Sequence, residues 1–502
     1  MIPLANTEVP DGEAAEATAP GRWTPRLLAS LISLVLAIEV VSASLTMVAV
    51  GLPDIVAHYH TTQGAWLSAS YMLVGAVISP LVGKLADMHG KRKLLLMTIA
   101  VAAVGALVSA VAPTYGLMII GRILQGFMAP AMFLVYSLIR DVFPSNKVAL
   151  SVSISMSGLG IFTAVSPYVT AWVLDHWGFR GIFWTIAICL PVIAAVIAAT
   201  TPETSVRLHS RIDLLGAVLF GAGLSGILVG VSFGPTWGWG STTTVTFLVV
   251  GAVVLAIWVV SALKLRNPVI DIRYFRRWPL FLTAVTAGLT YASTQSFTTV
   301  LPILCMTPAA LGLGYGLGLN AFGFAPILSA LGITLAIGGF IVGKLVRYIE
   351  ARILLGLGLL LIGLGAVLTA VEHDNRGLLI VFAALVGLGM GLGVSSVPNL
   401  VIAVVPAQVQ ASVASVISVV TSTGSAVLPV AIFAVLNSHI ATVAHGHALY
   451  SANGINLAFV IPAACAFFGM VIAFAVRWRI RDFTTEACGC GGQLADTGHN
   501  PR

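Results

Sequence analysis

Two residues of opposite charge stand inside long apolar runs of this sequence. Glu39 lies in the run 27–50, twelve residues after Leu27, and Arg122 lies in the run 115–138. At about 1.5 Å per residue, Glu39 falls near the middle of a hydrocarbon core of roughly 30 Å. A carboxyl group at that depth costs about 2.5 to 3.5 kcal/mol on insertion scales, a cost that usually accompanies a function. The chemistry that we expect there is reversible binding of a proton.

Arg122 is the natural partner to consider for this acid. It is the only cation within an apolar run, Glu39 is the only anion deep within one, and their depths differ by about one helical turn. An intramembrane arginine should face the interior of a helix bundle and find a partner. We therefore hypothesise that Glu39 and Arg122 share a polar cavity, and that binding of a proton or a substrate to the carboxylate alters the balance between them. The alternative is a purely structural ion pair.

The composition requires a membrane around these residues. Of 502 residues, 58% are hydrophobic and only 9% are charged, and the mean hydropathy is +1.01. These values are typical of a polytopic membrane protein whose surroundings are a lipid bilayer. The net charge of +7 does not indicate a nucleic-acid partner, because the basic residues do not gather on one solvated face. The first 26 residues hold four acids and no apolar core, so they are not a cleavable signal peptide.

Fourteen apolar runs are long enough to cross a bilayer. They are 27–50, 62–83, 94–112, 115–138, 148–174, 181–200, 213–233, 244–263, 279–304, 319–343, 353–371, 377–403, 410–436 and 456–476. Of the 25 lysines and arginines, all but Arg122, Arg180 and Arg376 fall in the two tails or in alternate loops. Because cytoplasmic loops retain positive charge, we expect both termini to be cytoplasmic.

The chain also repeats itself. "GKLADMHGKRKLLL" from Gly83 matches "GKLVRYIEARILLG" from Gly343 at six of fourteen positions, and two proline pairs recur at an offset of 262. We therefore expect an all-α polytopic membrane protein with 14 transmembrane helices, arranged as two parallel six-helix halves plus two inserted helices. The expected parts are a disordered cytoplasmic tail (1–26), the N-terminal half (27–200), the inserted helices with their loops (201–278), the C-terminal half (279–477) and a cytoplasmic tail (478–502).

These features resemble a major facilitator superfamily transporter, and the fourteen-helix layout resembles its drug:proton antiporter branch. The family pattern G-x-L-A-D-x-x-G-x-R/K-x is matched in the loop between the second and third runs by Gly83, Leu85, Ala86, Asp87, Gly90, Lys91 and Arg92. The resemblance implies that Gly83, Asp87, Gly90 and Arg92 form a cytoplasmic gate. Asp87 could face basic side chains or a positive helix N-terminus. The loop "VVPAQVQ", which has no lysine or arginine, favours the second option. The alternative is an incidental acid in a positively charged loop.

Three further matches indicate a substrate cavity. Arg122, Gln125 and Gly126 resemble the R-x-x-Q-G motif, Trp66 and Tyr71 resemble W-x-x-x-x-Y, and Thr46, Leu52 and Pro53 resemble the end of the family's first helix. In that helix Ser44 stands where the family has an aspartate, so Glu39 is interpreted as a displaced substitute. The predicted cavity residues are Ser44, Thr46, Tyr71, Gln125, Tyr291, Gln295 and Asn399. For any one of them, an interhelical hydrogen bond is the alternative.

One motif of the antiporter branch is missing. Its fifth helix typically carries G-x-x-x-G-P-x-x-G-G, whereas this chain has "FTAVSPYVTA" and retains only Pro167. Those glycines allow the tight helix packing that limits leakage. Antiport is therefore less securely indicated than membership of the superfamily, although Gly158 and Gly160 stand just upstream.

The leading prediction is a plasma-membrane transporter that exports small amphipathic or cationic compounds in exchange for protons, by rocking of two halves. A metabolite facilitator or a proton symporter of the same fold is the alternative, and a polytopic membrane enzyme is disfavoured because the acids of the outer loops are scattered. We expect a monomer without cofactors. No G-x-x-x-x-G-K-[ST] loop is present, so we do not expect ATP-driven pumping by this chain alone. Metal binding by the loop histidines (His58, His60, His439, His445 and His447) or by Cys488 and Cys490 is a minor alternative, because neither set makes a complete site.

Overall fold

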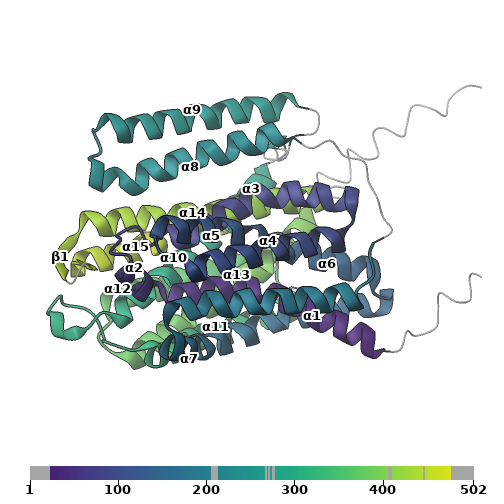
Figure 1. The fold of residues 1–502 in the computed structure, drawn as a ribbon, viewed down its shortest axis with the longest axis horizontal. Helices are drawn as coiled ribbons and strands as arrows, with labels where there is room; N and C mark the ends of the chain where they lie inside the picture. Colours follow the sequence, from purple (N-terminus) through teal and green to yellow (C-terminus); the bar gives the residue numbers. More distant parts are fainter. Residues whose placement is uncertain are drawn as a thin grey trace, which may run out of the picture.

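The computed structural model describes residues 23–204, 213–265, 268, 272–273, 278–346, 348–404, 410–444 and 447–475. Within these ranges the fold is almost entirely helical (Figure 1). The long helices are α1 (Pro25–Val50), α3 (Trp66–His89), α4 (Lys91–Val111), α5 (Tyr115–Gln125), α6 (Ala131–Val142), α7 (Ser145–Thr200), α8 (Leu214–Trp237), α9 (Thr242–Lys264), α10 (Trp278–Met306), α11 (Ala321–Leu345), α12 (Ala351–Val371), α13 (Arg376–Val404), α14 (Gln410–Ser438) and α15 (Ala452–Ala475). Short elements are α2 (Leu52–His58), η2 (Gly126–Met128), η4 (Ala309–Leu311), β1 (Ile440–Ala444) and β2 (His447–Tyr450).

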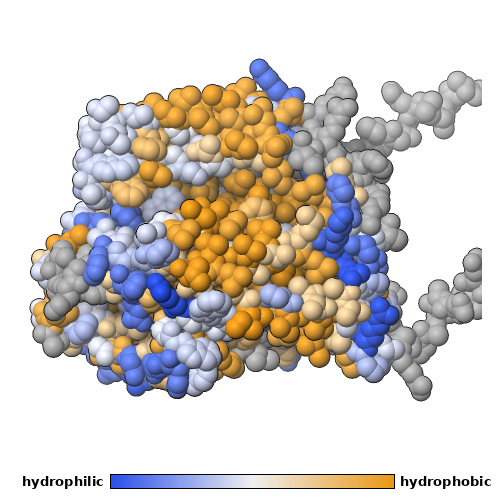
Figure 2. Space-filling model, viewed as in Figure 1, coloured by the Kyte–Doolittle hydropathy of each residue, from blue (hydrophilic) through white to orange (hydrophobic). Residues whose placement is uncertain are grey.

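The surface has the character of a membrane protein. Orange apolar atoms form a band across the middle of the face shown in Figure 2, and blue polar atoms gather toward its two ends. In the described part of the chain, twelve helical segments are long and apolar enough to cross a membrane. We call the two ends of the bundle the Gly90 end, where α3 meets α4, and the hairpin end, where β1 pairs with β2.

Helix α7 consists of two helices that meet at Gly178, whose φ of 64° and ψ of −171° are not helical. Contacts with α1 show that the chain reverses there. Before the bend Gly158 lies beside Glu39, and Leu174 and Ile182 on the two sides of the bend both lie beside Gly51. At the far end, Arg26 Nε donates to the Thr200 carbonyl at 3.2 Å. The predicted runs 148–174 and 181–200 are therefore two antiparallel helices.

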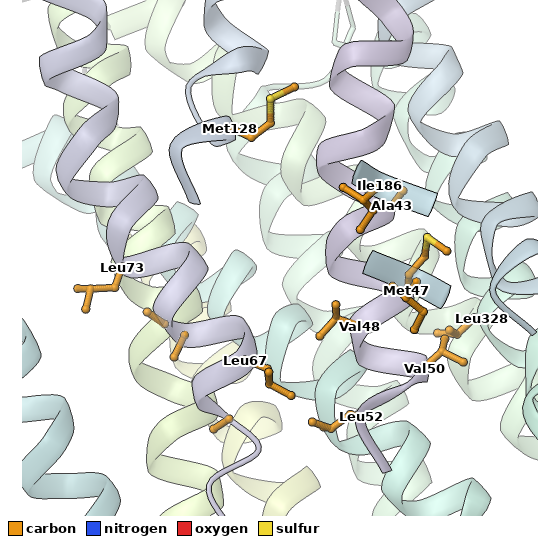
Figure 3. Packing of buried hydrophobic residues seen from close by; sticks show 14 of the residues in the cluster. Ala43, Met47, Val48, Val50, Leu52, Leu67, Leu73, Met128, Ile186 and Leu328 are labelled. Carbon is orange, nitrogen blue, oxygen red and sulfur yellow. The ribbon is translucent and has the colours of Figure 1, made fainter. Parts of the chain in front are cut away.

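Two seams join the first helices of the chain to the last ones. Helix α3 packs along α14, and α7 packs along α11. In the first seam Asn437 Nδ2 donates to the Thr62 carbonyl at 3.2 Å, and in the second Ser329 Oγ donates to the Ala164 carbonyl at 2.6 Å. The apolar core runs across both: Figure 3 shows side chains of α1 and α3 together with Ile186 of α7 and Leu328 of α11.

Helices α8 and α9 form a separate hairpin at the edge of the bundle (Figure 1). Helix α8 packs against α3 and α14 at the first seam. Trp66 Nε1 donates to Ser232 Oγ at 2.9 Å, and Ser232 Oγ in turn donates to the Gln63 side-chain carbonyl. Most side chains of α9 are exposed, as expected for a helix that faces lipid.

The structure differs from the predicted elements at three places. The segment Gly83–Arg92, predicted as a loop, is helical on both sides of Gly90, because α3 continues to His89 and α4 begins at Lys91. The fourth span breaks at η2, just before Pro130, a residue that cannot continue the hydrogen-bond ladder. The segment between α14 and α15 contains an antiparallel hairpin in which Thr442 pairs with Leu449.

Candidate functional site

Glu39 is buried and unpaired. The residue is 2% exposed, and neither carboxyl oxygen has a hydrogen-bond partner among the described residues. A Cβ built on Gly158 of α7 would lie 2.9 Å from Oε1 and 3.2 Å from Val35 Cγ1. The missing side chain of Gly158 therefore makes the space that this carboxyl group occupies. The hydroxyl of Tyr136, on α6, interacts with it electrostatically.

Arg122 is the centre of a second polar cluster, which we call the Arg122 cluster. Its Nε donates to the Leu67 carbonyl at 2.8 Å, and its Nη1 donates to Ser44 Oγ at 2.9 Å and to Gln125 Oε1 at 2.8 Å. Gln125 Nε2 donates to Ser109 Oγ at 3.0 Å. The guanidinium carbon lies 4.9 Å from the ring centroid of Tyr71, a cation–π distance. Nη2 has no hydrogen-bond partner among the described residues.

The expected pairing of Glu39 with Arg122 is not formed in this conformation. Arg122 bonds to Ser44, and Glu39 stands five residues before Ser44 on the same helix. Five residues correspond to about 140° of rotation and about 7.5 Å of rise. The carboxyl group therefore points to a different sector of α1, toward α7. A structural ion pair between the two residues is absent for the same reason.

A cavity of about 140 Å³ lies among α1, α7, α10, α11 and α13. Its polar lining residues are Ser42, Thr46, Thr163, Tyr291, Thr294, Gln295 and Thr298, and its apolar lining residues are Leu45, Ala49, Leu328, Leu331, Leu335 and Met390. Among the described residues that line it, none carries a charge. The cavity can therefore hold an amphipathic molecule but offers it no counter-ion.

The structure divides the predicted cavity residues into three groups. Thr46, Tyr291 and Gln295 line the cavity. Ser44, Tyr71 and Gln125 belong to the Arg122 cluster instead. Asn399 does not line the cavity, and its Nδ2 donates to the Ser395 carbonyl of its own helix at 2.8 Å.

Sequence reasoning missed most of the cavity wall. Thr294 and Thr298 of α10 and Leu328, Leu331 and Leu335 of α11 were not predicted. A signal for the first pair exists, because threonines recur along α10 at 283, 286, 290, 294 and 298 with helical spacing. No comparable signal marks the leucines, which resemble those of any apolar helix. Gly158 was noted only as a packing residue, although it adjoins Glu39.

At the Gly90 end, Glu203 caps α4. Its Oε1 accepts from the Arg92 amide at 3.0 Å and its Oε2 accepts from the Lys93 amide at 2.9 Å. A carboxylate is well placed there because the first amides of a helix are unpaired and carry partial positive charge. Gly90 has a φ of 109°, which favours glycine, and a Cβ there would lie 2.6 Å from Glu203 Cδ. The prediction that Gly90 permits a tight turn is confirmed.

The other predicted gate residues surround this cap. Arg92 donates from its guanidinium group to the Ala198 carbonyl. Asp87 interacts electrostatically with Lys91, Asp141 and Arg140, and Lys91 Nζ forms an ion pair with Asp141 Oδ2 at 2.5 Å. Gly83 lies within α3. A Cβ built on it would lie 3.6 Å from the Phe133 ring, an ordinary contact distance, so packing does not require glycine there. The loop that was expected to face Asp87 falls at 405–409, outside the described residues.

The described residues contain no group of three or more potential metal ligands. His58 packs against the rings of Tyr59 and Phe179, with centroids 4.9 and 5.0 Å away. His439 Nδ1 lies 3.0 Å from Ser438 Oγ and 2.9 Å from the Val435 carbonyl. His445, Cys488 and Cys490 lie outside the described residues, and so does the side chain of His447.

Together, the apolar spans, the two seams and the uncharged internal cavity define a multi-pass helical membrane protein of the kind that moves solutes. The Major Facilitator Superfamily sequence model matches residues 32–213 and 191–429. The chain therefore belongs to the Major Facilitator Superfamily of transporters, as its sequence motifs predict.

Several characterised and uncharacterised proteins resemble it. The chain is 29% identical over 428 residues to the multidrug resistance protein Stp of Mycobacterium tuberculosis, covering 82% of this chain and 76% of that protein. It is 22% identical over 442 residues to the uncharacterized MFS-type transporter YcnB of Bacillus subtilis, covering 86% and 91%. It is 26% identical over 284 residues to the tetracenomycin C resistance and export protein of Streptomyces glaucescens, covering 55% and 52%.

Solved structures resemble the fold. The peptide transporter POT in complex with sulfate superposes with a TM-score of 0.66 at 16% identity, covering 94% of this chain and 98% of that one. At this identity the likeness concerns the fold alone, which is that of a helical transporter.

Proposed function

We propose that this transporter exports small amphipathic molecules in exchange for protons, and that Glu39 binds the exchanged proton. The single observation that carries the proposal is the buried carboxyl group in the middle of α1 that has no hydrogen-bond or ionic partner among the described residues. A carboxyl group fixed in an ion pair serves packing, whereas an unpaired one in a membrane span is expected to serve a proton relay. The relatives named for multidrug resistance and for tetracenomycin C export support the direction of transport.

A route between the acid and the cavity supports coupling. The Tyr136 hydroxyl interacts electrostatically with both Glu39 and Tyr291, and Tyr291 lines the cavity. Tyr136 therefore lies between Glu39 and the residues that line the cavity. Arg122 takes part indirectly in this scheme, by holding Ser44 of the same helix.

The architecture that we propose has fourteen spans. The twelve candidate segments become fourteen when α7 is divided at Gly178 and the 29-residue α10, which is less apolar, is included. Two six-helix halves, with α8 and α9 inserted between them, would then rock about the two seams. Lysine and arginine gather at the Gly90 end, which favours a cytoplasmic location for that end and for both termini in the plasma membrane. We propose a monomer, because the helices on both sides of each seam belong to the same chain.

In this scheme the Gly90 end is the cytoplasmic gate. Gly90 and Arg92 join α3 and α4 to Glu203, and Asp87 faces the charges of Lys91 and Arg140. Gly83, on α3, is the first residue of the same motif. These contacts all lie within the first six spans, so they stiffen one half as it moves against the other.

The experiment is uptake of tetracenomycin C into energised inverted vesicles, with the internal pH followed in parallel. The native protein should take up the compound and release protons from the lumen, and both signals should be lost in Glu39→Gln. Glu372→Gln, an exposed acid in the loop after α12, is the matched control and should behave like the native protein. Uptake by native protein that is insensitive to collapse of the proton gradient would contradict antiport and favour facilitated transport. Absence of any uptake would contradict export of this class of compound.

A further inference from the structure

The cavity has walls of two kinds. Helix α10 contributes Tyr291, Thr294, Gln295 and Thr298, which share one helix face at spacings of three and four residues. Helix α11 contributes Leu328, Leu331 and Leu335, again on one face. A molecule that fills the cavity therefore meets a polar wall and a separate apolar wall.

Three hydroxyl groups of the cavity lining can act only as hydrogen-bond acceptors toward a ligand. Thr294 Oγ1 donates its hydrogen to the Thr290 carbonyl at 2.8 Å, and Thr298 Oγ1 donates to the Gln295 carbonyl at 3.0 Å. On α1, Thr46 Oγ1 donates to the Ser42 carbonyl at 3.1 Å. Because a hydroxyl has one hydrogen and two lone pairs, each of these groups has only lone pairs left for a ligand. These three hydroxyls are thus matched by O–H or N–H donors of a bound molecule, while the Tyr291 hydroxyl and the Gln295 amide of the same lining can donate as well as accept.

The described lining of the cavity contains no charged group that could pair with a charged ligand. No described lining residue is ionic, and Glu39 lies outside the lining, beside Gly158. The charged group of the Arg122 cluster, which is fully buried in the same half of the protein, is a cation. An organic cation would lose its hydration without gaining an anionic partner.

From these observations we propose that the cavity binds uncharged, hydrogen-bond-donating amphipathic molecules such as phenols and alcohols, in preference to organic cations. The proposal rests on the proposed function for the role of the cavity, and it narrows the sequence-based prediction, which admitted cationic compounds. The donor groups of the ligand lie against α10, and its apolar part lies against α11.

The test is a binding measurement that needs neither transport nor a gradient. Purified protein in lipid nanodiscs is incubated with tritiated 4-tert-butylphenol, with empty nanodiscs as the blank. Two unlabelled competitors of similar shape are compared: 4-tert-butylanisole, which lacks the donor, and (4-hydroxyphenyl)trimethylammonium, which keeps the donor and adds a positive charge. We expect the anisole to compete about fivefold more weakly than the unlabelled phenol, the effect of one hydrogen bond. The ammonium compound should be the weakest competitor.

Variants on α10 locate the interaction. Thr294→Val removes a lining acceptor and should reduce the difference between phenol and anisole. Thr286→Val is the matched control, because Thr286 also donates to its own helix, at 2.8 Å from the Leu282 carbonyl, but does not line the cavity. Equal competition by the ammonium compound, or no saturable binding of the phenol, would overturn the proposal even if proton-coupled export is observed. Selective binding of the phenol in a protein that fails to move protons would instead leave it intact and contradict the proposed function.

Discussion

At the scale of single residues, the site is built on a separation of charges. Arg122 has three hydrogen-bond partners, the Leu67 carbonyl and the side chains of Ser44 and Gln125. Glu39 has no such partners within the part of the chain that the structure describes. A carboxyl group without a fixed partner can gain and lose its proton without first breaking an ion pair. The absence of an acid at position 44 is therefore consistent with our proposal that Glu39 binds the proton.

Gly158 should be needed for this acid to keep its place. Gly158→Ala puts a methyl group 2.9 Å from Glu39 Oε1, and such overpacking costs about 1 to 3 kcal/mol. We expect lower thermal stability and at least a severalfold loss of proton-coupled uptake. Gly343→Ala is the control, because nothing lies within 4 Å of its built Cβ. A Gly158→Ala protein as active and as stable as Gly343→Ala would contradict the described position of the carboxyl group.

Ser44→Asp tests the idea that Glu39 replaces a missing acid. The new carboxylate would stand where Ser44 now bonds to Arg122 at 2.9 Å, so we expect it to form an ion pair and raise the melting temperature. Bonds to charged groups contribute about 1.5 to 3 kcal/mol. It should not restore coupling to Glu39→Gln, because a carboxylate held by Arg122 remains charged. Restored proton release in the double variant, followed by luminal pH, would show that position 44 can serve as the proton site.

At the scale of helices, hydropathy predicted the position of nearly every long helix, because a run of about twenty apolar residues is the length that a helix needs to cross a bilayer. It failed where local backbone chemistry decides the structure. The reversal at Gly178 depends on a positive φ, and the break at η2 depends on a proline whose effect is a kink in some helices and a terminus in others. The hairpin of β1 and β2 lies in a loop whose short length gave no strand pattern.

The candidate site was predicted unevenly for a related reason. Thr46 was predicted from its match to the family's first helix, and Tyr291 and Gln295 were predicted because they are polar or aromatic residues in apolar spans. Asn399 was predicted on the same ground, but its side chain donates a hydrogen bond to a carbonyl of its own helix. The sequence does not distinguish a polar residue that lines the cavity from one that bonds within its helix. The orientation of Glu39 away from Arg122 follows from helical phase, which could be calculated only after Ser44 was known to be the contact.

The turn between α3 and α4 should depend on glycine for two distinct reasons. Gly90→Ala forces an L-residue to a φ of 109° and brings its Cβ within 2.6 Å of Glu203 Cδ. We expect a loss of about 2 kcal/mol or more in unfolding free energy, measured as a lower melting temperature. Gly238→Ala isolates the backbone effect, because its φ is 87° and nothing surrounds it. Adding Glu203→Ala should recover part of the loss at Gly90, and equal effects of the two glycine variants would show that the contact with Glu203 is unimportant.

At the scale of the whole molecule, the proposed exchange would be electrogenic, because the described lining of the cavity is uncharged and the proposed proton site is separate from it. A neutral molecule leaving against an entering proton moves one charge for each proton. A potential of about 60 mV contributes about 1.4 kcal/mol per charge, or about tenfold in accumulation. Inverted proteoliposomes made positive inside with potassium and valinomycin should therefore accumulate more tetracenomycin C. Accumulation that does not respond to the potential would contradict the exchange of a neutral molecule for a proton.

The most direct test of the account separates movement of the substrate from movement of the proton. Glu39→Gln in proteoliposomes should still exchange labelled for unlabelled tetracenomycin C across the membrane, within about twofold of the native rate, because the cavity residues are unchanged. The same variant should fail to accumulate the compound when a pH gradient is imposed. Retained exchange with lost accumulation is the predicted result. Loss of both to the same extent would make Glu39 a structural residue, and accumulation that persists would exclude it as the proton site.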